Sequence, residues 1–230
     1  MRLNHFLKQP FLAKLSDSGP GANQSCALKP EDVRRGLRQF AAMQLSAVVM
    51  GHSSSSILGG AGWDEATASA MTEVLGNGPF VTTNGLDCLA ALGAVSVRRP
   101  FLVLPPWFND ATVAAGVQYY AARGAPPSGH HRYDPGPGWR DMPPAELYGH
   151  GMGLAQQVEP LHTQIRTWCP AEADGVLIAG TGLRCVGIIK ALEQDLARPV
   201  VSANQASLWH CLRRAGVREA VAGYGGLLRG

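Results

Sequence analysis

The side chains best suited to chemistry lie in two loops, each of which follows a short apolar run. Residues 46–50 (SAVVM) lead into GHSSSS at 51–56, and residues 174–178 (DGVLI) lead into AGTG at 179–182. His52 is the candidate general acid or base, because an unperturbed imidazole changes charge near neutral pH. The alternative interpretation of His52 is a polar loop residue that bonds only to its neighbours.

Both loops also offer groups that could bind an anion. Hydroxyls and backbone amides at a strand-to-helix turn can form an anion nest, and the same groups can cap the helix that follows. The two roles are compatible, since the amino terminus of a helix is itself an anion site. The candidate carboxylate-binding residues of the loops are Ser53, Ser54, Gly180, Thr181 and Gly182.

Further candidates end other strands. Thr82, Thr83 and Asn84 close the run PFVTTN and could face the same cleft, with a strand end and a helix cap as the alternative. Trp107 could form an aromatic wall for a ligand or only cover the core. Asn204 closes the similar run PVVSAN and is interpreted as a helix cap.

The order of elements that must position these residues occurs twice. A strand, a small-residue loop, a helix, a second strand ending in Asn and a second helix span about 46–92 and again about 174–212. Alternation of this kind predicts an α/β fold with two pseudo-symmetric lobes, each a short parallel sheet flanked by helices, and an active-site cleft between them. The expected lobes are residues 1–97 plus 204–230, and residues 98–203.

Three further segments can be assigned. Residues 100–104 read as a strand, and a helix is expected from Asp110 to about Ala122, with Asn109 or Asp110 as its cap. The segment 124–144 is rich in Gly, Pro and His, lacks periodicity and reads as a surface loop or lid.

Composition excludes several classes of protein. Of 230 residues, 46% are hydrophobic and 16% charged, which is a globular balance. The net charge is +3, but the arginines are scattered, so nucleic acid is not an expected partner. Neither a signal-peptide core nor a membrane span is recognisable, and a cytoplasmic protein without membrane association is expected.

The cysteines and paired histidines do not indicate a metal site. Five cysteines lie far apart and without a CxxC pair, which favours reduced thiols. His130 and His131 are adjacent and are expected to point apart. We interpret Cys88, Cys185 and Cys211 as packing residues, with Cys185 inside a helix.

These motifs resemble the aspartate/glutamate racemase superfamily, on the branch of maleate isomerases and arylmalonate decarboxylases. VMGHSSSS (49–56) resembles the first active-site motif of that branch, and DGVLIAGTGLR (174–184) resembles the second. PVVSANQASLW (199–209) and the closing GYG (223–225) resemble two further motifs. The resemblance covers about 46–228.

The resemblance implies an enzyme that needs neither metal nor organic cofactor. Such proteins bind a small carboxylic or dicarboxylic acid between two lobes and stabilise an enolate or enediolate with preorganised donors. Two facing cysteines usually transfer the proton or act as nucleophile. Subunit pairing is common in the superfamily, so a homo-oligomer is a further expectation.

Three chemical positions depart from the pattern. His52 stands in the place of the first cysteine, Gly180 in that of the second, and Trp107 in that of a substrate-contacting tyrosine. Decarboxylase relatives also lack the first cysteine but keep the second. The opening strand of the family, with its substrate loop, is not recognisable in residues 1–29.

We therefore expect an isomerase or decarboxylase in which His52 replaces cysteine chemistry, and we disfavour a two-cysteine racemase. The alternative is a non-catalytic descendant that keeps the cleft as a carboxylate-binding or regulatory module. A nucleotide-binding Rossmann protein fits less well, because Gly180-Thr181-Gly182 lacks the third glycine of that fingerprint.

Overall fold

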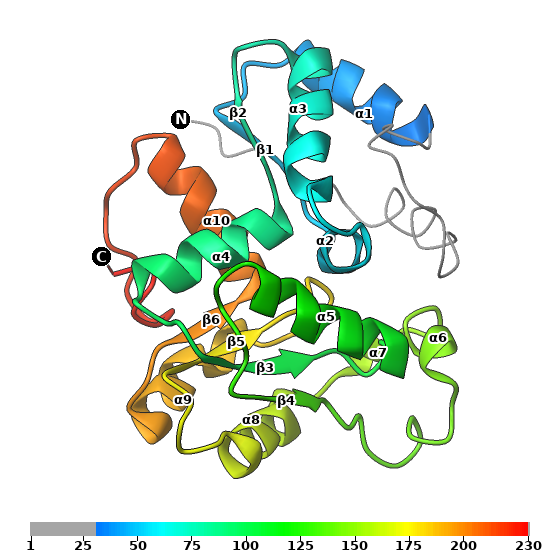
Figure 1. Cartoon of the computed structure of the whole chain (residues 1–230), viewed down its shortest axis with the longest axis vertical. Coiled ribbons are helices and arrows are strands. Elements are labelled where there is room, and N and C mark those ends of the chain that lie inside the picture. The colour runs from blue at the N-terminus through cyan, green and yellow to red at the C-terminus, as the bar shows by residue number, and fades with distance from the viewer. Residues whose placement is uncertain (1–30, 230) are drawn as a thin grey trace.

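The structure, a computed structural model, describes residues 31–229. The expectations for residues 1–30, including those on a signal peptide and on the opening strand, lie outside the described residues. Figure 1 shows two small α/β lobes, one above the other, with a pair of helices between them.

All strand pairings in the described chain are parallel. The upper sheet has the order β1-β2, and the lower sheet has the order β4-β3-β5-β6. The predicted fold class is confirmed: short parallel sheets are flanked by helices. The strands are β1 (Ala47–Met50), β2 (Phe80–Thr83), β3 (Pro100–Leu104), β4 (Gly129–Arg132), β5 (Gly175–Ile178) and β6 (Val200–Ser202).

The helices alternate with these strands, as parallel pairing requires. None of the described helices has the length and apolar character needed to cross a membrane. They are α1 (Glu31–Ala41), α2 (Ser53–Leu58), α3 (Trp63–Leu75), α4 (Asn84–Ala94), α5 (Asp110–Ala122), α6 (Pro144–Leu147), α7 (Met152–Ala155), α8 (Val158–Trp168), the 3-10 helix η2 (Val186–Ile188), α9 (Ile189–Leu196) and α10 (Ala203–Arg214).

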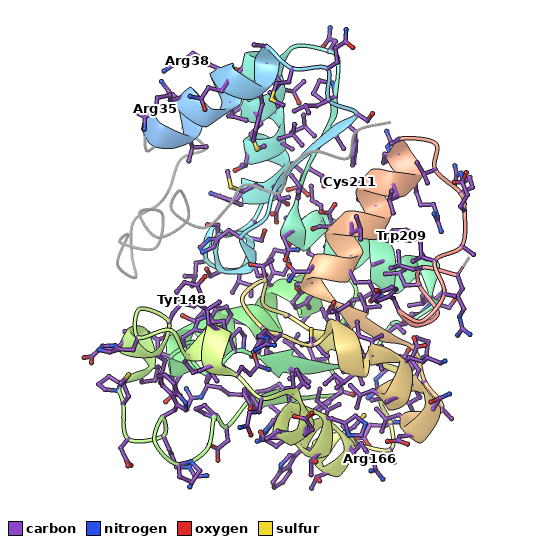
Figure 2. All side chains as sticks on the ribbon, turned by 180° about the vertical axis from the view of Figure 1, so that it is seen from behind. Arg35, Arg38, Tyr148, Arg166, Trp209 and Cys211 are labelled. Carbon is purple, nitrogen blue, oxygen red and sulfur yellow. The ribbon has the colours of Figure 1, made fainter. Side chains whose placement is uncertain are left out.

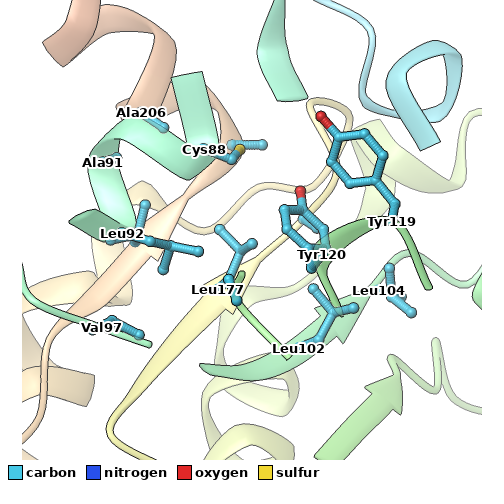
Figure 3. Packing of buried hydrophobic residues seen from close by; sticks show 14 of the residues in the cluster. Cys88, Ala91, Leu92, Val97, Leu102, Leu104, Tyr119, Tyr120, Leu177 and Ala206 are labelled. Atoms are coloured by element: carbon cyan, nitrogen blue, oxygen red, sulfur yellow. The ribbon is translucent and has the colours of Figure 1, made fainter. Parts of the chain in front are cut away.

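Each lobe has its own apolar core. In the upper lobe, side chains of α1 and α3 pack on the sheet around Leu37 and Met71. The lower sheet is covered on both faces, so its central strands β3 and β5 are continuous apolar runs with every residue buried. One face meets α8 and α9. The other meets α4, α5 and α10, where Tyr120, Leu102 and Leu177 pack together (Figure 3).

Helices α4 and α10 join the lobes. They are the helices that follow β2 and β6, and they pack against each other as well as against strands of both sheets. Thr83 caps α4 by accepting from the Leu86 amide, and Ser202 caps α10 in a capping box with Gln205. The proposed boundaries at residues 97 and 203 stay a prediction.

The two halves of the internal repeat are offset by one residue at this point. Asn84 is the first residue of α4, whereas Asn204 is the second residue of α10. One residue of an α-helix corresponds to about 100° of rotation, so the two side chains point in different directions. Asn84 is fully buried and Asn204 is exposed.

Most predicted elements are confirmed, and two expectations are wrong. Asn109 caps α5, because its side chain accepts from the Thr112 amide at 2.9 Å. The segment 124–144 is not only loop, since β4 within it pairs with β3 at the sheet edge. Cys185 precedes η2 instead of lying inside a helix, although it is buried as expected, like Cys88 and Cys211.

Candidate active site

The first turn of the site, residues 51–56, carries His52 at the junction of β1 and α2. Its backbone is extended (φ −135°, ψ 96°), and its amide donates to the Met50 carbonyl at 3.0 Å. His52 therefore occupies the N-cap position of α2, but its side chain makes no capping bond. No atom of residues 31–229 lies within 4 Å of a Cβ added at Gly51, so the described part of the chain leaves space beside this turn.

Two serine hydroxyls contact the His52 ring in different ways. The Ser55 Oγ lies 2.6 Å from Nδ1, a hydrogen-bond distance. The Ser54 Oγ lies 3.1 Å from Nε2 and 3.4 Å from Nδ1. An oxygen almost equidistant from both ring nitrogens cannot lie along the lone-pair axis of either. Ser54 therefore sits over the ring, and Ser55 alone of these two is bonded to a single ring nitrogen.

Burial lowers the pKa of His52 from 6.5 to about 4. The cause is loss of hydration, which disfavours the charged imidazolium. The ring is neutral at neutral pH in the free protein. The His52 residue is half-buried, so part of its surface is exposed.

Asn84, at the start of α4, connects the first turn to α10. Its Oδ1 accepts from the Ser53 hydroxyl at 2.7 Å, and its Nδ2 donates at 2.9 Å to both the Ala203 carbonyl and the Ser207 Oγ. These bonds span three separate segments of sequence. A buried amide with both donors occupied is a rigid connector, because any rearrangement would leave polar groups unpaired.

The second turn, residues 179–182, is held by the same end of α10. The Asn204 Nδ2 donates to the Thr181 carbonyl at 3.0 Å. Asn204 directly follows Ala203, whose carbonyl accepts from Asn84. The two turns of the site are thus linked through Ser53, Asn84 and the N-terminal residues of α10. This linkage is the observation on which the site depends, because it holds both loops against one helix end.

The second turn has no room for a larger side chain at Gly180. Its φ is +145°, in the region that favours glycine, and an added Cβ would clash with the Pro105 ring. A cysteine at this position is incompatible with the observed backbone. The turn can therefore contribute backbone groups and the Thr181 hydroxyl, but no acid or base at position 180.

Two aromatic rings lie against Gly182. An added Cβ there would come within 2.8 Å of the Trp107 ring and 3.0 Å of the Tyr148 ring. The two rings meet edge to face, with centroids 5.2 Å apart. Tyr148, which directly follows α6 and is labelled in Figure 2, is partly exposed. The pair forms an aromatic wall beside the second turn.

Thr82 and Thr83 direct their hydroxyls to buried carboxylates. The Thr82 Oγ1 donates to Asp87 at 2.8 Å, and the Thr83 Oγ1 donates to Asp64. Both carboxylates are fully buried, and each receives further donors. These partners could not be predicted from the sequence, because they lie on helices whose contacts depend on tertiary packing.

The ten predicted site residues fall into two sets. Those with exposed surface are His52, Ser54, Trp107, Thr181 and Gly182. Those fully buried are Ser53, Thr82, Thr83, Asn84 and Gly180. Contact of any of them with substrate stays a prediction. Two neighbours that sequence reasoning missed are Ser55, hidden within a run of four serines, and Tyr148, which no motif marked.

The thiols and histidines of the described chain do not converge. Within residues 31–229 no cluster of three or more His, Cys, Asp or Glu side chains could hold a metal ion. His131 bonds to Gln164 and stacks on Trp168. Burial raises the pKa of Cys185 to about 11, so this thiol is not a ready nucleophile.

Known proteins resemble the chain in sequence and in fold. The arylmalonate decarboxylase family model matches residues 154–228, which include the second turn. No curated protein matches the chain.

Three solved structures illustrate the shared fold. The maleate isomerase Iso from Pseudomonas putida S16 has a TM-score of 0.73 at 17% identity, over 87% of this chain and 77% of that one. Unliganded arylmalonate decarboxylase has a TM-score of 0.66 at 25% identity, over 86% and 80%. A Nocardia farcinica maleate cis-trans isomerase variant with a covalently bound succinylcysteine intermediate has a TM-score of 0.75 at 21% identity, over 90% and 81%.

Proposed function

We infer that the chain belongs to the maleate isomerase and arylmalonate decarboxylase branch of the aspartate/glutamate racemase superfamily. From this premise we propose that it is a cofactor-independent isomerase or decarboxylase of a small carboxylic or dicarboxylic acid. His52 is the group that moves the proton. Ser54, Thr181 and Gly182, with the backbone of both turns, hold the carboxylate, and Trp107 borders it. The observation that carries this proposal is the half-buried His52 ring on a turn that is linked to the second turn.

Decarboxylation would use these groups in two steps. The bond from Cα to one carboxylate breaks, CO₂ leaves, and the electron pair passes into the other carboxylate as an enediolate. Donors of the two turns stabilise that charge. The imidazolium of His52 then gives its proton to Cα and is reprotonated by solvent. In an isomerase of this kind, the neutral ring would take a proton from one carbon, the electron pair would pass into the enolate, and the imidazolium would return the proton to a different carbon so that the double bond shifts.

A bound anion would prepare His52 for the donor role. The free ring is neutral because burial lowers the pKa of His52 to about 4. A carboxylate next to the ring favours the charged imidazolium and raises that pKa. Substrate binding would therefore be coupled to proton uptake, and apparent affinity for a dicarboxylate would increase as the pH falls toward 5.

The proposed chemistry is one-sided. One relative forms a bond to cysteine, as its succinylcysteine intermediate shows, but this chain has His52 and Gly180 at the two cysteine positions. Gly180 can carry no acid or base. Proton transfer would come from the His52 side alone, which disfavours a racemase that needs a proton donor on each face of the substrate.

The second candidate is a carboxylate-binding module without turnover. The clash of any side chain at Gly180 with Pro105 favours it, because one half of the usual catalytic pair cannot be rebuilt in this backbone. The binding groups of the first turn would remain.

The decisive experiment combines turnover with isotope exchange. The protein is incubated with malonate, aryl- and amino-substituted malonates and maleate in deuterated water. NMR then follows loss of substrate and entry of deuterium at Cα. Deuterium in the product that disappears in His52→Ala supports the enzyme. Binding of these acids without turnover or exchange would instead support the binding module.

A further inference from the structure

We propose that Ser55 is the positioning residue for His52, and that Nε2 of the imidazole is the atom that exchanges a proton with the substrate. This inference rests on the proposed function. It names the reacting atom and a residue that the motif comparison does not distinguish from its three serine neighbours.

The four serines of the first turn have four different environments. Ser53 donates to Asn84, and the Ser56 Oγ accepts from the Gly85 amide at 3.1 Å. Both are buried, so they fasten α2 to α4. Ser54 and Ser55 remain, and both are half-buried beside the imidazole.

The positions of these two hydroxyls separate the ring nitrogens. Ser55 lies within 2.6 Å of Nδ1 and occupies it. Ser54 lies over the ring face, and no other hydrogen bond to Nε2 forms within residues 31–229. Proton transfer follows the lone-pair axis, so Nε2 is the nitrogen that can meet a substrate carbon.

Ser55 is also suited to hold the ring through a cycle of proton transfer. A hydroxyl can accept from a protonated Nδ1 or donate to a bare one, so the contact survives a change of tautomer or charge. Its backbone amide bonds to the His52 carbonyl at 3.2 Å, which closes the turn between the two residues. The ring orientation is therefore set within one helical turn.

The test compares Ser55→Ala, Ser55→Thr and Ser54→Ala by NMR titration of His52. The Ser55 oxygen accepts from the Nδ1–H of the imidazolium and so stabilises the charged ring. Its removal should lower the constant for proton binding to His52 about three- to tenfold. Ser55→Thr keeps a hydroxyl and should restore the value. Ser54→Ala should leave it unchanged, because that oxygen does not lie along either lone pair.

Kinetics on an acid that the protein turns over supply the second measurement. Ser55→Ala should lower kcat about tenfold with little change in KM, and its pH profile should move in step with the NMR titration. Equal titration curves for wild type, Ser55→Ala and Ser54→Ala would overturn the proposal. So would an unchanged kcat. A shifted titration curve with no turnover on any acid tested would count against the proposed enzyme while leaving the Ser55 contact intact.

Discussion

The two turns of the site follow equivalent strands, yet they are built from different materials. The first turn presents an imidazole and the two half-buried hydroxyls of Ser54 and Ser55 on a short helix, and within the described residues no atom crowds Gly51. The second turn presents mainly backbone, packed against Pro105 on one side and against two aromatic rings on the other. A pseudo-symmetric scaffold can therefore support asymmetric chemistry, because symmetry of the backbone does not require symmetry of the side chains.

The largest expected effect tests whether all acid or base chemistry lies in the first turn. His52→Ala should lower kcat by about 10²- to 10⁴-fold, the usual contribution of general acid-base catalysis, and should lose only the part of the substrate affinity that depends on proton uptake by the imidazole. His130→Ala, which removes an exposed histidine from β4, is the matched control and should keep full activity. Turnover that survives in His52→Ala would place the chemistry elsewhere.

The next effect tests the packing of the second turn. Gly180→Cys should reduce the free energy of unfolding by about 4 kcal/mol, from backbone strain together with the clash against Pro105. It should not create a second proton donor. Gly51→Ala is the control at the first turn and should change stability by less than about 0.5 kcal/mol. Chemical denaturation measures both, and a stable Gly180→Cys protein would contradict the asymmetry of the turns.

The two asparagines that connect the turns should differ in importance. Asn84→Ala leaves the Ser53 hydroxyl and the Ala203 carbonyl without their buried partner, and should cost about 3 kcal/mol of folding stability. Asn204→Ala removes one exposed bond and should cost less than about 1 kcal/mol. Denaturant unfolding of both variants gives the comparison. Equal losses would mean that the offset of the two helices has no energetic consequence.

The smallest expected effect is on the pH dependence of stability. The pKa of His52 is about 4 in the folded protein and 6.5 as its ordinary value. The unfolded chain therefore binds a proton first as the pH falls, and folding loses stability between pH 6.5 and 4. Allowing for partial exposure of the ring, the loss is about 2 kcal/mol.

Thermal unfolding across that pH range should reveal this loss. His52→Asn should lack it, while the contributions of the carboxylates remain common to both proteins. The difference between the two curves thus isolates one side chain. Parallel curves would show that His52 is solvated in the folded state.

Much of the fold could be predicted from the sequence. Continuous apolar runs gave β3 and β5, and the repeated order of elements gave the two lobes, because burial on both faces of a parallel sheet leaves a clear pattern. β4 was missed, since its polar residues His130 and Arg132 carry no strand signal and only pairing with β3 orders them.

The site was predicted less completely than the fold. His52 and the two turns were identified from their place after buried strands. The partners of Thr82, Thr83 and Asn84 were not, because Asp64, Asp87 and Ser207 lie on helices whose contacts depend on tertiary packing. Ser55 could not be singled out, because only the structure separates an oxygen bonded to Nδ1 from one above the ring.

The packing of Gly180 against Pro105 has a consequence for how this protein can change. A cysteine at the second turn would require at least one accompanying substitution, because a cysteine alone meets the proline ring. The cysteine variant by itself would be destabilised, and selection removes such intermediates. Gly182 beneath Trp107 adds a similar barrier. Substitution can therefore alter the side chains of the first turn more readily than those of the second.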